Sequence, residues 1–321
     1  MPTATANSSA NARGVSTRAV SIGPGLPTGS FSLRVLAIHR QAINLRLEGP
    51  GLVLSLVGPS NEGEPTAISL GKDRDFRSWL PEIVTTGYID DDHLELRDAF
   101  GVLRAEINLV EALRLDPTAM PHIAKLGNAW NLARSELALI QARKSTELRI
   151  GDLNIRDRGQ GLAPSPLLRA ILELSRAPLS PSREALVRIA GSGQGLTPAG
   201  DDFLVGFAGA TVCVEGRADD RRGTEGIPCP PRLLADALLE GAKFTTELSA
   251  TQLRLASRGI FSAYLGALAE GIASEDSPKT IACLRRLCTI GHSSGADTAT
   301  GFLYGLGLLS GRADGIGHTA D

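Results

Sequence analysis

The sequence is poor in aromatic residues, in cysteine and in net charge. Of its 321 residues, 4% are aromatic and four are cysteine, and the formal net charge is −2. The near-zero charge argues against a nucleic-acid-binding protein, which normally carries a basic patch or stripe. No run approaches the roughly 20 apolar residues of a membrane span, and the first residues lack the apolar core of a signal peptide. We therefore expect a cytoplasmic protein that binds neither nucleic acid nor membrane.

The cysteines follow no metal-ligand spacing, and glycine is abundant. We predict that the cysteines are reduced and mostly buried; they are Cys213, Cys229, Cys283 and Cys288. The 36 glycines, together with the scarcity of aromatic residues, favour close backbone packing and loops that approach ligands. The length suggests about two domains.

The N-terminal part of the chain carries the strand signals. Residues 1–28 are rich in Ser, Ala, Thr and Pro, and are predicted to be a disordered tail. Four segments that follow alternate in part between apolar and polar residues and predict strands: 31–39, 42–47, 52–57 and 67–70. A turn is expected at 48–51. Residues 29–85 are therefore expected to form a small antiparallel β unit.

From about residue 95 the apolar residues recur at helical spacing. The first such set is Leu96, Ala99, Val102, Leu103, Ile107, Val110 and Leu113. Further helices are predicted over 128–148, 165–176, 182–190, 200–215, 231–270, 278–289 and 297–310. We predict an α+β fold class, in which the β unit precedes a mainly α-helical ligand-binding domain over 86–312. This domain contains two glycine-rich loop–helix elements, and a tail follows over 313–321.

The first glycine-rich element runs from Gly191 to Asp202, as Gly-Ser-Gly-Gln-Gly-Leu-Thr-Pro-Ala-Gly-Asp-Asp. Glycines let main-chain N–H groups approach an anion, and a following helix N-terminus adds a favourable dipole. In one interpretation the glycines only form a tight turn and the aspartates complement the helix dipole. In the other, the loop binds a carboxylate or phosphate, and an aspartate binds an amino group or Mg²⁺. The candidate binding residues are Gly193, Gln194, Gly195, Thr197, Gly200 and Asp201.

A second segment, 291–302, repeats part of the first. Four residues align without gaps with four others: Gly200, Asp202, Gly206 and Phe207 with Gly295, Asp297, Gly301 and Phe302. An Asp and a Gly four residues apart share a helix face, and the glycines permit close helix–helix approach. If the two faces pack together, Asp202 and Asp297 come near each other. Chance or shared helix-packing chemistry is the alternative explanation of the match.

The polar residues of this second loop are further candidates. His292 is either a hydrogen-bonding partner or a general acid–base group. Ser293 and Ser294, with Gly295, are candidates for an anion nest of backbone N–H groups.

A third candidate segment is the hydroxyl-rich run 245–259, which we predict to be helical. Thr245, Ser249 and Gln252 would share one face, with Thr246 beside Ser249. This stripe could reach a common ligand, or its hydroxyls could be surface or back-bonded groups. The run Lys144-Ser-Thr-Glu-Leu-Arg149 is only faintly similar to the phosphate loops of carbamoyltransferases and is expected to end a helix.

These segments together resemble the oxamate carbamoyltransferase subunit AllH family. The resemblance lies in Gly193–Leu204, in Thr246 and Ser249, and in Gly291–Asp297, and the runs His39–Leu45 and Leu56–Pro59 are similar to its β segment. It covers roughly residues 30–310, with Ala199 standing where Ser is expected. It implies a role in allantoin-type purine breakdown, in an enzyme that interconverts oxalurate and phosphate with oxamate and carbamoyl phosphate. It also implies an FdrA-like subunit and a further companion subunit as partners.

We therefore predict a carbamoyltransferase subunit that acts on a small anionic amide. The catalytic candidates are Asp202, Asp297 and His292. Thr246, Ser249, Ser293, Ser294 and Gly295 join the first loop as substrate-binding candidates. The sequence establishes no cofactor but leaves Mg²⁺ open, with Asp201, Asp202 and Asp297 as its ligands if it is bound. Two alternatives are a non-catalytic binding or regulatory subunit of an FdrA-like complex, and a metal-assisted hydrolase of a ureido or amide acid.

Overall fold

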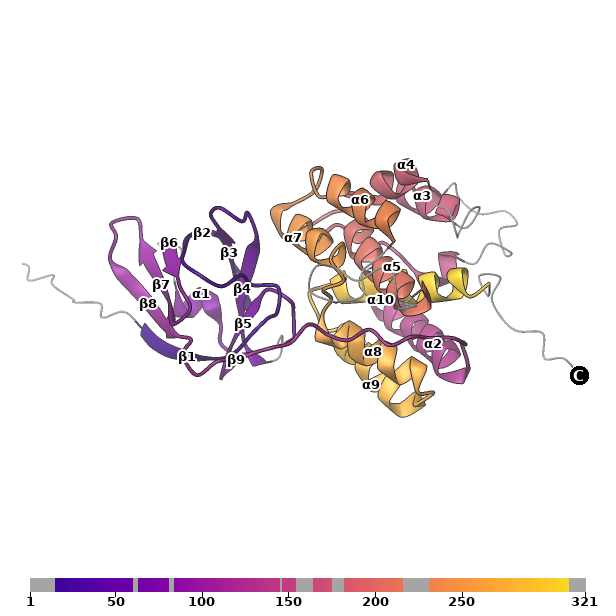
Figure 1. Ribbon diagram of the computed structural model, residues 1–321, viewed down its shortest axis with the longest axis horizontal. Coiled ribbons are helices and arrows are strands. Elements are labelled where there is room, and N and C mark those ends of the chain that lie inside the picture. Colours follow the sequence, from indigo (N-terminus) through magenta and orange to yellow (C-terminus); the bar gives the residue numbers. More distant parts are fainter. Residues whose placement is uncertain are drawn as a thin grey trace, which may run out of the picture. The chain divides into compact units, whose positions relative to one another are not determined.

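The computed structural model describes residues 15–59, 63–80, 84–144, 146–153, 164–174, 182–215 and 231–311. The chain divides into two compact units, Met1–Glu62 with Thr66–Leu115, and Gly63–Pro65 with Asp116–Asp321. The tail predicted at 313–321 and the first 14 residues of the tail predicted at 1–28 lie outside the described residues. The first unit contains the strands and the second contains nearly all of the helices (Figure 1).

The N-terminal unit is a closed barrel of eight strands. They are β1 (Val15–Ile22), β2 (Phe31–Ile38), β3 (Ala42–Leu47), β4 (Val53–Val57), β5 (Ala67–Leu70), β6 (Val84–Ile89), β7 (His93–Asp98) and β8 (Leu103–Asn108). Neighbours follow the order β5-β4-β3-β2-β6-β7-β8-β1, and β1 also pairs with β5, which closes the barrel. The short strand β9 (Leu113–Arg114) pairs with β1, and helix α1 (Phe76–Trp79) follows β5.

Strand β1 closes the barrel because it pairs on both of its edges. It runs parallel to β8, with Val15 opposite Ala105, and antiparallel to β5, with Ile22 opposite Ile68. A bulge between Ala19 and Ser21 interrupts the second pairing, and bulges increase the local twist of a strand. The β4–β5 pair is also parallel. The fully buried core of this unit includes Ile43, Leu45, Leu54, Leu56, Ile68, Leu94, Leu96, Ala105 and Ile107.

The predicted fold class, a small antiparallel β unit before a mainly helical body, is therefore wrong. β1 lies within the segment expected to be a tail, and the residues interpreted as helical from Leu96 onward form β7, β8 and β9. In β7 the buried residues alternate with partly exposed ones, and in β8 Ala105 and Ile107 are buried two residues apart. A tight turn separates the two strands. Its N–H groups at Phe100 and Val102 donate to the Asp98 carboxylate.

The second unit is helical in its described part. Its elements are α2 (Asn128–Arg143), η2 (Ile150–Leu153), α3 (Pro166–Leu174), α4 (Arg183–Ile189), α5 (Ala199–Glu215), α6 (Arg232–Gly241), α7 (Glu247–Ala256), α8 (Ala263–Ala273), α9 (Ser277–Leu287) and α10 (Ser294–Leu309). The single helix predicted over 231–270 is three helices. The side chains of Thr246 and Ser262 cap the N-termini of α7 and α8 by accepting from Ser249 N and Leu265 N, and such caps favour new helix starts.

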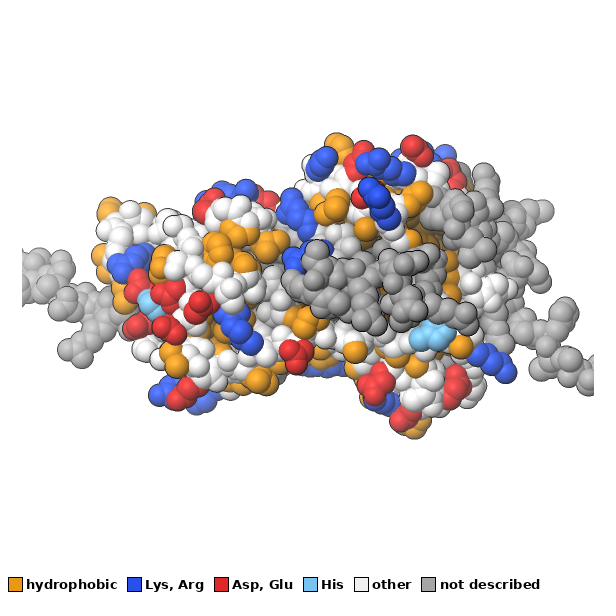
Figure 2. Space-filling model, viewed as in Figure 1, with side chains coloured by type: hydrophobic (Ala, Val, Ile, Leu, Met, Phe, Trp, Pro, Cys, Tyr) orange, Lys and Arg blue, Asp and Glu red, His pale blue; other side chains and the backbone are white. Residues whose placement is uncertain are grey.

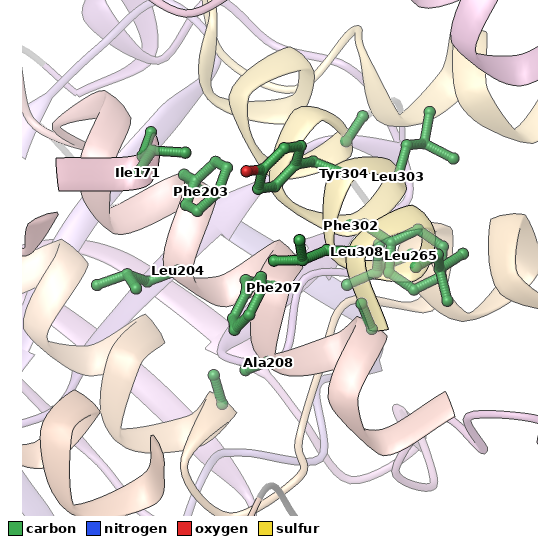
Figure 3. Packing of buried hydrophobic residues seen from close by; sticks show 14 of the residues in the cluster. Ile171, Phe203, Leu204, Phe207, Ala208, Leu265, Phe302, Leu303, Tyr304 and Leu308 are labelled. Carbon is green, nitrogen blue, oxygen red and sulfur yellow. The ribbon is translucent and has the colours of Figure 1, made fainter. Parts of the chain in front are cut away.

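Helices α5 and α10 pack against each other at the centre of this unit (Figure 1). A Cβ atom at Gly206 would lie 1.9 Å from the Thr298 carbonyl oxygen, and one at Gly301 would lie 2.0 Å from the Phe203 carbonyl oxygen. The close approach predicted from these glycines is confirmed. Aromatic rings fill the space beside the glycines, with the ring centroids of Phe203 and Tyr304 5.9 Å apart (Figure 3).

No helix in the described part of the chain is both long and apolar enough to cross a membrane. Lys and Arg side chains and Asp and Glu side chains both occur on the visible face of each unit (Figure 2).

Candidate functional site

Two helix–loop–helix segments, α4–α5 and α9–α10, enter their second helix in the same way. The Gly200 amide donates to the Ser192 carbonyl oxygen at 2.8 Å, and the Gly295 amide donates to the Ile290 carbonyl oxygen at 3.2 Å. A Cβ atom at either glycine would lie about 2.0 Å from a carbonyl oxygen at the end of the preceding helix, at Ile189 or Leu287. These two glycines therefore serve packing, and their N–H groups are occupied within the protein rather than free for the anion that the sequence suggested.

The aspartates of the repeat, Asp202 and Asp297, occupy the first turns of α5 and α10 and are 1% and 0% exposed. Asp202 Oδ1 accepts a hydrogen bond from the Ser294 hydroxyl at 2.8 Å. Asp202 Oδ2 and both carboxylate oxygens of Asp297 are buried and make no hydrogen bond of good geometry with a described residue. The Thr197 hydroxyl near Asp202, and the Ser293 hydroxyl and the Leu148 amide near Asp297, still favour the ionised carboxylates. Three of the four oxygens of this acid pair thus lack the well-aligned donor that a buried carboxylate normally has.

The electrostatics of the acid pair follow from burial and from the charges of neighbouring carboxylates. Burial raises the pKa of Asp202 well above its usual value; the Ser294 hydroxyl opposes this, and the charge of Asp297 adds to it. The predicted proximity of the two aspartates is therefore confirmed. Burial also raises the pKa of Asp297 to about 7, with a smaller opposing effect from the nearby Ser293 hydroxyl. Asp297 can therefore exchange a proton near neutral pH.

Asp201 differs from Asp202 because both of its carboxylate oxygens accept hydrogen bonds. It accepts from the Gly191 amide at 2.8 Å and from the Thr245 hydroxyl. Burial raises its pKa and these two donors oppose the rise. Thr246, the N-cap of α7, also donates to the Leu196 carbonyl oxygen at 2.5 Å. Asp201, Thr245 and Thr246 therefore fasten the first loop to α7, which is a structural role.

The sequence did not single out the segment that follows α2. Glu147 Oε2 accepts from the Gln194 amide at 3.4 Å, and its charge raises the pKa of Asp297. The Lys144 ammonium donates to the Cys288 carbonyl oxygen at 2.7 Å and to that of His292 at 3.2 Å. This segment therefore contacts both loops. The sequence signal here was the faint similarity of Lys144–Arg149 to the phosphate loops of carbamoyltransferases, and it led to no site assignment.

The remaining predicted residues lie in different surroundings. Gly193, Gln194 and Gly195 form an exposed loop in which both glycines have positive φ, 116° and 94°. His292 is exposed, and Thr197 is partly buried and lowers the pKa of Asp202. Ser249 is fully buried, and its hydroxyl has no hydrogen-bond partner among the described residues.

Metal binding has little support from the geometry. Within the described residues, no group of three or more His, Cys, Asp or Glu side chains is placed to hold a metal ion. Of the three aspartates considered as Mg²⁺ ligands, Asp201 is already held by Gly191 and Thr245. The acid pair alone supplies two carboxylates, whereas Mg²⁺ prefers octahedral oxygen coordination.

Part of the chain matches the model of a known protein family. No solved structure matches the chain. The matched family is described as oxamate carbamoyltransferase subunit AllH, and its model covers residues 189–306. This range contains both loops, the acid pair and α7, and excludes the barrel and the segment after α2. The family resemblance seen in the sequence is confirmed: over the helices that carry Asp202 and Asp297, the chain matches the oxamate carbamoyltransferase subunit AllH family.

Proposed function

We propose that this chain is a carbamoyltransferase subunit that acts on a small anionic amide such as oxamate, with carbamoyl phosphate as the carbamoyl donor. The observation that carries the proposal is the buried acid pair, in which three of the four carboxylate oxygens make no hydrogen bond of good geometry with a described residue. A buried acceptor without a donor costs free energy, on the order of 1–3 kcal/mol, and such groups concentrate at functional sites. The N–H groups of an amide or ureido substrate are donors that match these oxygens. The family match over the same helices supplies the reaction class.

The two carboxyl groups suit different roles in carbamoyl transfer. The amide nitrogen of the acceptor attacks the carbamoyl carbon, a C–N bond forms, and the C–O bond to phosphate breaks. Asp297, whose pKa is about 7, accepts the proton that the nitrogen loses. Asp202, whose pKa burial raises well above its usual value, is assigned in this proposal as the carboxyl group that donates a hydrogen bond to a substrate oxygen.

We further propose that an FdrA-like subunit and a second companion complete the enzyme. The word subunit in the family description implies a multi-subunit complex. In the described part of this site, Lys144 already donates to two carbonyl oxygens. A companion chain is therefore the proposed source of the cation that holds phosphate. The free thiols of Cys213, Cys283 and Cys288 fit a reducing cytoplasm; Cys229 lies outside the described residues.

The test is an assay of the chain together with its companion subunits. Formation of oxalurate from oxamate and carbamoyl phosphate should fall by about 10²–10⁴-fold in Asp297→Asn, since a general base typically contributes that much. The matched control is Asp236→Asn, an exposed aspartate of α6, which should keep the wild-type rate. Thermal unfolding of each variant separates lost chemistry from lost folding.

Other results would favour the other functions. A complex that needs this chain but keeps its full rate with Asp297→Asn would point to a non-catalytic subunit. A complex that hydrolyses ureido acids and loses all activity after chelation would point to the metal-assisted hydrolase.

A further inference from the structure

A pocket in the helical unit lies beside the start of α10. Its empty volume is about 460 Å³, including space open to solvent. Most of its lining is apolar, with Leu255, Phe261 and Leu265 among the side chains. The segment Gly63–Pro65, which belongs to the helical unit, supplies one wall through Glu64. The Gly63 carbonyl oxygen accepts from the Ala263 amide at 2.9 Å, which holds this wall against α8.

Among the described residues, the polar side chains of this pocket include no cation; they are Glu64, Gln252 and Ser294, together with the hydroxyls of Ser262 and Thr298. Gln252 Oε1 is buried and has no hydrogen-bond partner among the described residues. The Ser294 hydroxyl gives its hydrogen to Asp202, so it offers the pocket only lone pairs. Glu64 adds a carboxyl group, and the described lining contains no Lys or Arg. A carboxylate or phosphate would therefore find no charge partner here, whereas a group with N–H donors would pair the unsatisfied acceptors.

The pocket is connected to the acid pair through one side chain. Ser294 lines the pocket, and its hydroxyl donates to Asp202 Oδ1 at 2.8 Å. A ligand N–H that reaches the Ser294 oxygen is thus one hydrogen bond away from Asp202. An apolar wall with a few converging polar groups is the usual composition of a small-molecule site.

We propose that this pocket binds an uncharged amide or ureido group that carries a short hydrocarbon substituent. The pocket is then the subsite for the uncharged end of an acceptor larger than oxamate, whose amide is bonded directly to its carboxylate, and to that extent the inference rests on the proposed carbamoyl transfer. Gln252 Oε1 and the Ser294 oxygen accept the ligand N–H groups, and the apolar side chains contact the hydrocarbon part. Any carboxylate on the same ligand stays at the part of the pocket that is open to solvent.

The test measures binding of three probes to the full chain by isothermal titration calorimetry. Butylurea should bind at least tenfold more tightly than urea, because each buried CH₂ contributes about 0.8 kcal/mol. Butyrate should bind more weakly than butylurea. Gln252→Leu should weaken butylurea binding about tenfold by removing the amide acceptor. Gln41→Leu, an exposed glutamine of the barrel unit, is the matched control and should leave binding unchanged.

A charge reversal gives a second, independent variant. Glu64→Lys places an ammonium in the lining, so it should strengthen butyrate binding and weaken butylurea binding. Butyrate binding as tight as that of butylurea in the wild-type chain, or unchanged butylurea binding in both variants, would overturn the inference. Butylurea binding could follow these expectations while the complex performs no carbamoyl transfer. That result would support the ligand assigned to the pocket and would overturn only the proposed function.

Discussion

The two helix–loop–helix segments are alike where helix packs on helix and different where the loops are anchored. Gly200 and Gly295 pack against the preceding helix, and Gly206 and Gly301 let α5 and α10 touch. The first loop is held by the Asp201 carboxylate, whereas the second has Ala296 at the aligned position and is held by the Lys144 ammonium. The glycines that the two segments share are needed for helix packing, whereas each loop is held in place by a different residue.

The same comparison separates the two aligned aspartates. Asp202 has a hydroxyl donor in Ser294, which comes from the other segment. No hydrogen bond of good geometry reaches either oxygen of Asp297 from a described residue, although the Ser293 hydroxyl and the Leu148 amide lie close enough to lower its pKa. A repeat that kept both acids only for helix dipoles would leave them near solvent, where they interact favourably with a helix N-terminus. Here both aspartates are buried. The α9–α10 segment therefore keeps Asp297 although its burial lowers the stability of the fold, as functional sites often do.

The largest expected effect tests the shared packing. Gly301→Val should destabilise the protein by about 3 kcal/mol or more, since overpacking costs roughly that and the new Cβ would lie 2.0 Å from the Phe203 carbonyl oxygen. Gly151→Val is the control, because a Cβ there meets nothing within 4 Å. Urea unfolding measures both. Equal unfolding midpoints for the two variants would mean that α5 and α10 do not touch through their glycines.

A smaller effect tests the unpaired acid. The folded-state pKa of Asp297 is about 7, above the roughly 3.9 of an unfolded aspartate. The folded protein therefore binds more protons between these values, and its stability should fall as pH rises from about 4 to about 7. Asp297→Asn should remove this part of the pH dependence. At pH 8 it should raise the free energy of unfolding by on the order of 2 kcal/mol.

Chemical denaturation at pH 5 and pH 8 measures this difference. Asp276→Asn, at the exposed N-cap of α9, is a control that should leave the slope in place. An Asp297→Asn chain whose stability declines over the same pH window as the wild type would show that this carboxyl is ionised and paired.

The smallest effects compare the two loop anchors. Thr245→Val removes a donor to the buried Asp201 carboxylate and should cost about 1–2 kcal/mol. Lys144→Met removes two hydrogen bonds from a partly exposed ammonium and should cost about 1 kcal/mol. Hydrogen exchange should localise the first change to the Gly191 amide and the second to residues 288–295. Ser135→Ala, which removes an exposed hydroxyl on α2, should change neither region. Opening of both loops in either variant would contradict separate anchoring.

The barrel shows where sequence patterns were sufficient and where they were not. Strands β2 to β5 were predicted because turn residues bound each short apolar run. Strands β7 and β8 were missed because Leu96, Ala99, Leu103 and Ile107 also fit a helical period. The pairing of β7 with its neighbours β6 and β8, and of β8 with the distant β1, decided between these periods and placed Leu94 and Leu96 in the barrel core. Strand β1 carried no local signal that outweighed its Ser- and Thr-rich surroundings.

The candidate site also has features that the sequence predicted and features that it did not. The sequence by itself determined the paired Gly and Asp positions of α5 and α10, because a fixed spacing on a helix fixes which residues share a face. It could not determine that Asp201 is an anchor, that Glu147 approaches Asp297, or that Gln252 and Ser294 line one pocket. Those facts depend on burial and on contacts between segments far apart in the chain. Only the tertiary structure decided them, because a carboxylate loses its water, and its ordinary pKa, only when distant segments close around it.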